Sequence, residues 1–278
     1  MKKILISSLL FSALFGNFSF ADEAQLSSQI SSDSNSTINQ AEGKRYYDLA
    51  LTYRWKNFNE EKLLTNLERS ASYGYTKANM LLGLYYKNDK KDYKKAFENY
   101  SIAANAGIGD GFAALGSIYN NGLGVAKDPQ KAIEYYEKAM ALDSGWAYTD
   151  IGYLGYKKGE FGYEKNDQKA VEYYKKGCEL GSDAGCYNLG RAHQYGIAGL
   201  EVNGQKAVEY YEKAAALDNS RAMVDLSLLY KNWDSHLVPK DKEKSKYWED
   251  RALEIGQASD VIAIGASKGM GSLFGLFR

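Results

Sequence analysis

Two sets of marker residues recur along this chain at a nearly constant interval, and this repetition constrains the fold more than any other feature. Members of the first set lie 33, 36, 38 and 37 residues apart: Leu82-Gly83, Leu115-Gly116, Ile151-Gly152, Leu189-Gly190 and Leu226-Ser227. Members of the second set lie 36, 38, 37 and 38 residues apart: Lys95-Ala96, Lys131-Ala132, Lys169-Ala170, Lys206-Ala207 and Lys244-Ser245. Two independent sets with one period indicate an array of repeated units.

Each unit is predicted to contain two helices, because the start of the second helix is marked every time. The residue three positions before each marker lysine is an Asp or Asn, whose short side chain can accept a backbone N–H in the first turn of a helix. Pro129 lies where a first-turn proline costs no hydrogen bond. We expect second helices to begin after the five residues Asp92, Asp128, Asn166, Asn203 and Asp241.

The patterns A-x3-LG-x2-Y, G-x-G-V-x2-D and KA-x2-YY-x-KA recur in these units, and residues 110–144 match them almost completely. The chain thereby resembles the Sel-1-like repeat (SLR) family, which is related to tetratricopeptide solenoids, over roughly residues 77–256. The resemblance implies an all-α fold, a right-handed α-solenoid (superhelix) of about six antiparallel helix pairs. We assign this solenoid to residues 43–256, with degenerate first and last repeats.

Residues 1–21 have the features of a secretory signal peptide. Lys2 and Lys3 precede a short apolar run, and a small-residue cleavage site ends at Ala21. A retained membrane anchor is the alternative, but the apolar run is short and interrupted. We therefore expect a bacterial protein that is periplasmic or secreted.

Two further segments lie outside the repeats. Residues 22–42 are rich in Ser and Asn with few large apolar side chains, so we expect a disordered leader. Residues 257–278 form a Gly-rich apolar tail. This tail is either a loose segment or extra cap helix, or it docks onto the solenoid, a partner or a membrane surface.

The charge balance and the composition exclude several classes of function. The chain has 35 basic and 35 acidic residues and no basic stripe, so we expect no nucleic-acid partner. No Ser-His-Asp elbow, Ser-x-x-Lys signature or paired histidines are present, so we expect no catalytic residue, cofactor or metal. His193 occupies a consensus tyrosine position and is interpreted as a packing residue. We expect a monomer.

Cys178 and Cys186 are the only cysteines, and they lie eight positions apart across the junction between two units. Two helix ends meet there over a short loop, and an exported chain enters an oxidising compartment, so we predict a disulfide. Their spacing also resembles that of secreted cysteine-rich SLR proteins of bacteria. Some members of that group are described as binding penicillin or hydrolysing β-lactams, which implies an alternative function.

The first helix of each unit lines the concave surface in tetratricopeptide-like solenoids. Positions six and three before the marker glycine, and one and four after it, share one helix face. Large aromatic and Arg side chains on that face match the residue types of binding hot spots, and the alternative is ordinary variable surface. The partner-binding candidates are Trp146, Tyr153, Tyr156, Tyr187, Arg191 and Gln194.

The family resemblance implies a non-enzymatic interaction module that binds a protein partner on its concave face, in envelope assembly, host contact or stress signalling. A narrower hypothesis is an immunity protein that neutralises a toxin. The alternative is a binding protein or hydrolase for β-lactams or peptidoglycan fragments. The sequence does not identify the partner.

Overall fold

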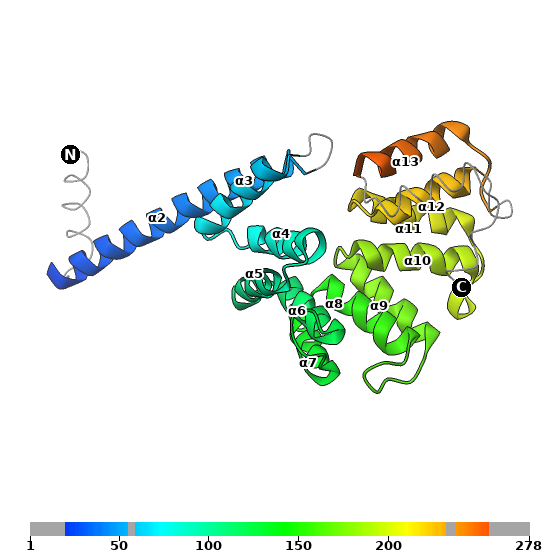
Figure 1. Ribbon diagram of the computed structural model, residues 1–278, viewed down its shortest axis with the longest axis horizontal. Coiled ribbons are helices and arrows are strands. Elements are labelled where there is room, and N and C mark those ends of the chain that lie inside the picture. Colours follow the sequence, from blue (N-terminus) through cyan, green and yellow to red (C-terminus); the bar gives the residue numbers. More distant parts are fainter. Residues whose placement is uncertain (1–19, 55–58, 232–236, 256–278) are drawn as a thin grey trace, which may run out of the picture.

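The computed structural model describes residues 20–54, 59–231 and 237–255, and its helices form six antiparallel pairs stacked in chain order (Figure 1). The predicted all-α right-handed solenoid is confirmed. The first helices of the pairs are α2 (Phe20–Leu51), α4 (Lys77–Tyr85), α6 (Gly109–Asn121), α8 (Gly145–Asp150), α10 (Asp183–Tyr195) and α12 (Ser220–Tyr230). The second helices are α3 (Glu60–Ser72), α5 (Tyr93–Asn105), α7 (Pro129–Met140), α9 (Asp167–Glu179), α11 (Gly204–Ala216) and α13 (Lys242–Ile255).

Three short segments modify this pattern. The π-helices η1 (Tyr86–Lys90) and η2 (Ile151–Lys157) extend α4 and α8, and a 3-10 turn, η3 (Ile197–Gly199), follows α10. A π-helical turn holds one more residue than an α-helical turn, so it changes the direction of the side chains that follow it.

The five predicted helix caps are confirmed. Each Asp or Asn accepts a hydrogen bond from the backbone N–H of the marker lysine at 2.9 or 3.0 Å, which satisfies a donor that the helix itself leaves unpaired. Pro129 stands in the first turn of α7. After α9, Gly181 adopts a positive φ of 84°, which costs glycine little and lets the chain turn into α10.

Each full unit is packed around a glycine on its first helix and a buried tyrosine on its second. A Cβ atom added at Gly190 would lie 2.5 Å from Cδ1 of Tyr211, and one added at Gly83 would lie 2.5 Å from Cε1 of Tyr100. Real side chains do not approach so closely, so only glycine lets the ring lie flat against the helix. The four pairs are Gly83 with Tyr100, Gly116 with Tyr136, Gly152 with Tyr174, and Gly190 with Tyr211.

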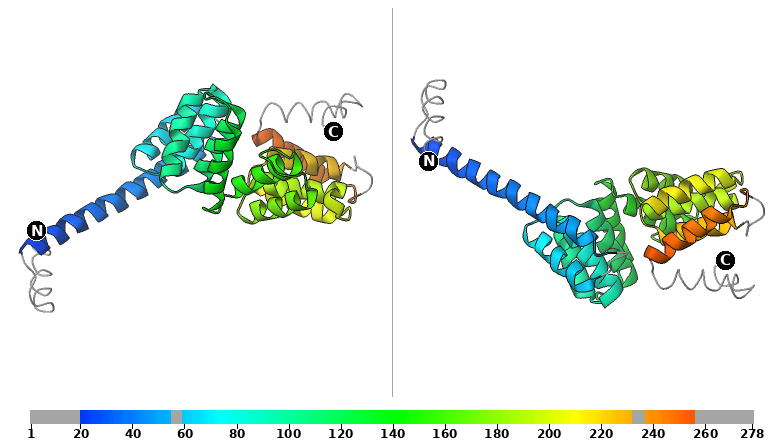
Figure 2. Two further views of the ribbon diagram at one scale, coloured as in Figure 1. Left: turned by 90° about the horizontal axis from the view of Figure 1, so that it is seen from below. Right: turned by 90° about the horizontal axis from the view of Figure 1, so that it is seen from above.

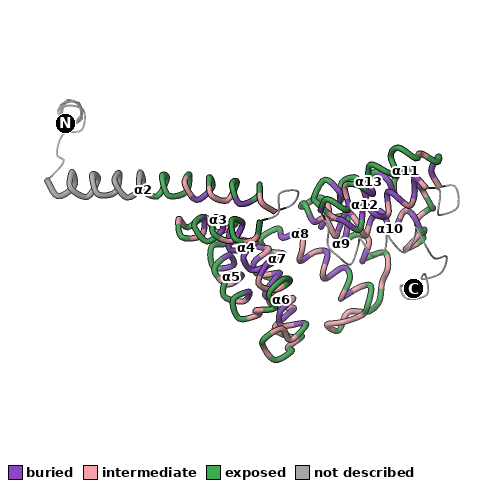
Figure 3. The backbone as a smooth tube through the Cα atoms, turned by 45° about the horizontal axis from the view of Figure 1, so that its top comes forward, coloured by how far each residue is buried: buried purple, intermediate pink, exposed green. Residues whose placement is uncertain are grey.

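The two end units depart from this pairing. Ala50 of α2 and Leu67 of α3 occupy the corresponding buried places in the first unit, and both belong to its core cluster. In the last unit Ser227 and Glu249 replace the glycine and the tyrosine, and the Ser245 hydroxyl donates a 3.0 Å hydrogen bond to the Ser227 carbonyl. Figure 3 shows the buried residues along the faces where helices stack, as expected of a repeat array.

The prediction of a disordered leader at residues 22–42 is wrong, because α2 runs without interruption from Phe20 to Leu51. Its C-terminal part packs on α3, where the Ser70 hydroxyl donates a 2.7 Å hydrogen bond to the Gly43 carbonyl. Residues 20–42 contain no Pro or Gly, and extending an existing helix is far easier than starting one. The N-terminal part of α2 projects from the stack in both views of Figure 2.

The predicted disulfide between Cys178 and Cys186 is present and joins the end of α9 to α10, with Cα atoms 4.6 Å apart. Within the residues that the structure describes, no helix is both long and apolar enough to cross a membrane. The predictions for residues 1–19 of the signal peptide and for the tail at 257–278 lie outside the described residues.

Replacing Gly190 by Ala is expected to lower the urea midpoint of unfolding. The added methyl would overlap the Tyr211 ring, and overpacking costs about 1–3 kcal/mol, whereas the gain in helix propensity is about 1 kcal/mol. The control is the same substitution in a Tyr211→Leu background, where the midpoint should no longer fall. A higher midpoint for Gly190→Ala in the wild-type background would contradict the packing account.

Candidate functional site

Electrostatic contacts between distant units identify the concave surface of the solenoid, which we call the inner face. Burial lowers the pKa of Lys87 in η1, and the carboxylate of Asp150 in α8, two units further along, partly offsets that effect. Burial also lowers the pKa of Arg54 in the first unit, and Asp218 between α11 and α12 partly offsets it. Units that are not neighbours come this close only on the inside of a curve, so these residues belong to the inner face.

Tyrosine hydroxyls reach from the core to the inner face, where they hydrogen-bond to aspartates. The Tyr136 hydroxyl of α7 pairs with Asp150 of the next unit, and the Tyr187 hydroxyl pairs with Asp225 of α12. The Tyr211 hydroxyl, which lies near Asp225, donates its proton to Oε1 of Gln194 at 2.6 Å. Each of these aspartates lies two residues before the marker position of its unit.

The unit formed by α4 and α5 lacks this pairing with the next unit. The hydroxyl of Tyr100 is buried and has no hydrogen-bond partner, and the residue two before the marker glycine of the next unit is Ala114. The same repeat position therefore carries a satisfied hydroxyl where the following unit supplies an Asp, and an unsatisfied one where it supplies an Ala.

Both aspartates are held in a poorly hydrated environment. Burial raises the pKa of Asp150 to about 6, while the Tyr136 hydroxyl and Lys87 act in the opposite direction. Burial likewise raises the pKa of Asp225 to about 6, opposed by the tyrosine hydroxyls and by Arg191 and Arg221. The inner face is therefore a charged surface from which water is partly excluded.

Five of the six predicted binding residues have surface available on the solenoid. Tyr153 is 43% exposed and Arg191 is exposed. Both line a small recess of about 50 Å³ between η2, α9 and α10. Trp146, Tyr156 and Tyr187 are partly buried and also pack against the core clusters. Their binding role stays a prediction.

The placement of Gln194 on the binding surface is wrong. Gln194 is only 7% exposed and accepts the Tyr211 hydroxyl bond inside the solenoid. Tyr156, inside η2, is half-buried like Trp146 and Tyr187, and its ring also packs against neighbouring rings. The ring centroid of Tyr156 lies 4.9 Å from that of Tyr163 and 5.0 Å from that of Tyr173.

Sequence reasoning missed the charged residues of the inner face, four of which stand at positions that can be counted from the repeat markers. Lys87 is four after its marker glycine and Arg221 is six before its marker serine, so the same positional rule extended to all units would have found both. Asp150 and Asp225 lie two before the marker, a position the rule did not include. The recurrence of Asp at that place was the available signal.

His193 has the packing role predicted for it. Its ring stacks on that of Tyr210 with centroids 5.5 Å apart and planes 3° apart. Burial, which is the largest effect, and Lys206 both lower its pKa, which favours the neutral ring. Among the described residues, no cluster of three or more His, Cys, Asp or Glu could hold a metal ion.

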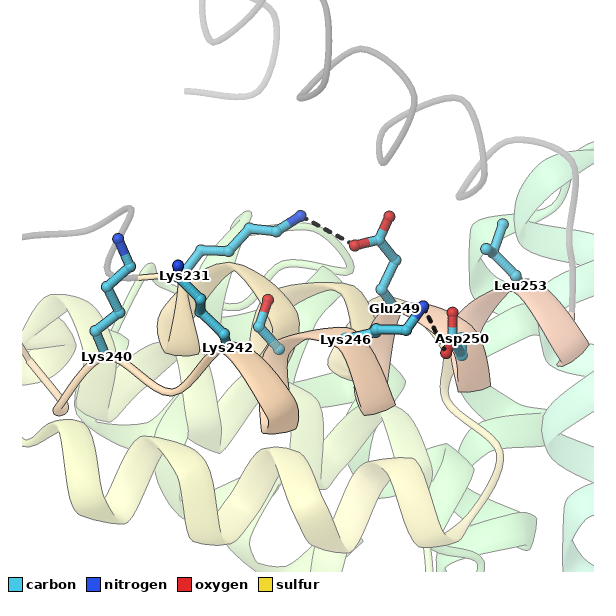
Figure 4. A pocket seen from close by; sticks show the side chains of 8 residues that line it. Lys231, Lys240, Lys242, Lys246, Glu249, Asp250 and Leu253 are labelled. Atoms are coloured by element: carbon cyan, nitrogen blue, oxygen red, sulfur yellow. Dashed lines mark hydrogen bonds and ion pairs between the residues drawn. The ribbon is translucent and has the colours of Figure 1, made fainter.

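A second recess, of about 330 Å³, lies on the last unit beside α13 (Figure 4). Lys231 forms a 3.1 Å ion pair with Glu249, and Lys246 lies 3.6 Å from Asp250. Glu249 stands at the repeat position of the core tyrosine, so the face on which a further unit would stack is charged here. A polar outer face is what an end unit of a solenoid needs for solubility.

The family model of the Sel1 repeat matches residues 76–108, 113–144, 148–182, 183–219 and 220–256. The chain belongs to the Sel1 repeat family. No curated protein matches the sequence significantly. A solved Sel1 repeat protein from Oxalobacter formigenes is 27% identical, with 77% of this chain and 86% of that chain covered and a TM-score of 0.53.

Two other solved structures are also similar. An immunity protein from Pseudomonas aeruginosa shares the fold at 20% identity, with 77% of this chain and 81% of that one covered and a TM-score of 0.57. Cysteine rich protein B of Helicobacter pylori is 31% identical over 49% of this chain and 96% of its own, with a TM-score of 0.37. Sel1 repeat proteins bind protein partners and generally act as non-enzymatic scaffolds.

Tyr136→Phe and Tyr100→Phe form a matched pair of substitutions with different expected outcomes. Tyr136→Phe removes the hydroxyl that pairs with Asp150, so we expect a loss of about 1–2 kcal/mol in the free energy of unfolding. Tyr100→Phe removes a hydroxyl without a partner and should be neutral or stabilising. Urea unfolding of the two variants measures the difference, and equal losses would contradict the assigned hydroxyl–aspartate pairing.

Lowering the pH from neutral to mildly acidic values is expected to raise the melting temperature. Asp150 and Asp225 have a pKa of about 6 in the folded protein, above the value of 3.8 expected without burial. The folded protein thus binds these protons more tightly than the unfolded chain does, and stability increases as the pH falls through about 6 toward 4.

The Asp150→Asn/Asp225→Asn variant tests whether these two aspartates cause the pH dependence, because the asparagine side chains stay neutral at every pH. It should be more stable than the wild type at neutral pH and should show a flatter dependence of melting temperature on pH. A variant with an unchanged pH dependence would show that other groups cause the effect.

Proposed function

We propose that this protein is an exported, non-catalytic adaptor that binds a protein partner with its inner face. The observation that supports the proposal most strongly is the concentration of aromatic and charged side chains there. Tyr153 and Arg191 are exposed beside each other, next to Tyr187 and the aspartates described above. Aromatic and Arg side chains contribute most to the energy of protein interfaces.

Export is part of this proposal. The predicted signal peptide and the Cys178–Cys186 disulfide both fit an oxidising compartment outside the cytoplasm. One solved neighbour of the same fold is an immunity protein. A narrower form of the proposal is therefore that the partner is a toxin. The β-lactam alternative stays a prediction, tested by whether penicillin shifts the melting temperature.

The test is a cross-linked pull-down with the full chain from the native envelope fraction, followed by mass spectrometry. We expect one dominant protein in stoichiometric amount. Recovery should fall about tenfold or more for a Tyr153→Ala/Arg191→Ala variant, because loss of interface hot spots costs more than about 1 kcal/mol each.

The matched control is Tyr247→Ala/Arg251→Ala, which removes the same residue types from α13. Tyr247 is 55% exposed, and Arg251 pairs with Glu254 on the same helix. This control should recover the partner as the wild type does. Thermal unfolding should show that both variants are folded. Equal recovery by the two variants would place the interface elsewhere, and no recovered protein would overturn the adaptor proposal.

A further inference from the structure

The outward face of α13 stands where the first helix of a seventh unit would stack. In the preceding unit, the matching positions of α11 are buried in one core cluster together with residues of α12: Val208, Tyr211 and Ala215. On α13 these positions carry Lys246, Glu249 and Leu253, which line the recess of about 330 Å³ (Figure 4). The place of a further helix is therefore open, and its surface is charged instead of apolar.

Four lysines and two acidic residues line this recess, so positive charge is in excess. Each acidic residue already has a lysine partner in the two ion pairs described above. The other two lysines are Lys240 and Lys242. Both are exposed, and neither forms an ion pair with any residue that the structure describes. Two positive charges of the recess are therefore available to a ligand.

The recess contains more than the exposed charges that keep an end unit soluble. Glu249 is only 7% exposed, and its ion pair with Lys231 compensates the cost of holding a carboxylate in a nearly buried place. Leu253 is 42% exposed and lies at the opposite end of the recess from Lys240 (Figure 4). The recess thus combines a fixed polar wall, a basic end and an apolar end.

We propose that the outward face of α13 binds an acidic helix of another protein. The shape follows from the repeat, because the second helix of a unit contacts the next first helix at every earlier junction. The charge follows from Lys240 and Lys242, which attract Asp and Glu side chains and repel Lys and Arg. This docking place goes beyond the inner-face proposal. Tyr247 and Arg251, the control positions for the inner face, do not line the recess.

Two other occupants match the charge of this face less well. Residues 257–278 of the chain contain one acidic residue, Asp260, and two basic residues, Lys268 and Arg278, so they supply no excess of negative charge. A second copy that docked with the same face would add two more lysines without a carboxylate partner. An acidic helix from another protein balances Lys240 and Lys242, and it is the occupant that the charges favour.

The experiment is a pair of parallel selections from displayed helical peptides that are randomised along one face. One uses the immobilised full chain and the other its Lys240→Glu/Lys242→Glu variant. We expect the wild type to enrich acidic helices that bind the variant about tenfold more weakly, and the variant to enrich basic helices instead. The matched control is Lys94→Glu/Lys175→Glu, which reverses two exposed lysines outside the recess and should bind the acidic helices as the wild type does.

Three results would overturn the inference. The first is that no enriched helix depends on Lys240 and Lys242, and the second is that the helices that depend on them carry no acidic residue. The third is self-association of the wild-type chain in sedimentation that the charge-reversed variant abolishes, because a second copy then covers the face. Both lysines are exposed, so the variant should melt like the wild type. The Tyr153→Ala/Arg191→Ala variant should bind the acidic helices normally, so this test fails or succeeds independently of the adaptor proposal.

Discussion

The close contact between a glycine on the first helix and a tyrosine ring on the second sets the geometry of every full unit. Because no larger residue fits between Gly190 and Tyr211, the two helices lie at one fixed separation, and the same contact recurs in four units. Where Ser227 and Glu249 replace the pair, the array ends with a charged face instead of a further apolar stacking surface.

The same tyrosine connects the core to the surface on which we place binding. Its ring is buried against the glycine, and in the unit of Tyr136 its hydroxyl also reaches the inner face and pairs there with Asp150 of the following unit. The charges of the inner face are thus attached to rigid packing, not to mobile surface side chains. Rigid, preorganised groups lose little entropy on binding, which suits a surface that recognises one partner.

Repetition made the fold predictable from the sequence, whereas the site was only partly predictable. Helix starts follow from local chemistry, so Asp128 and Asn166 could be identified as caps from their spacing alone. The binding residues depend on the exact direction of side chains. A hydrogen bond from Tyr211 holds Gln194 inside the solenoid, which the spacing of Gln194 along its helix does not reveal. The helix at residues 22–42 was missed because composition describes what a segment can bury, not whether an adjoining packed helix extends into it.

The central claim is that the inner face, and not the outer surface, contacts the partner. Site-specific photo-cross-linking tests it most directly: a photoreactive amino acid is placed at position 153 on the inner face or at position 247 on α13, and the protein is illuminated in its native envelope. The account predicts a single cross-linked protein from position 153 and none from position 247. Cross-links from position 247 alone would contradict it.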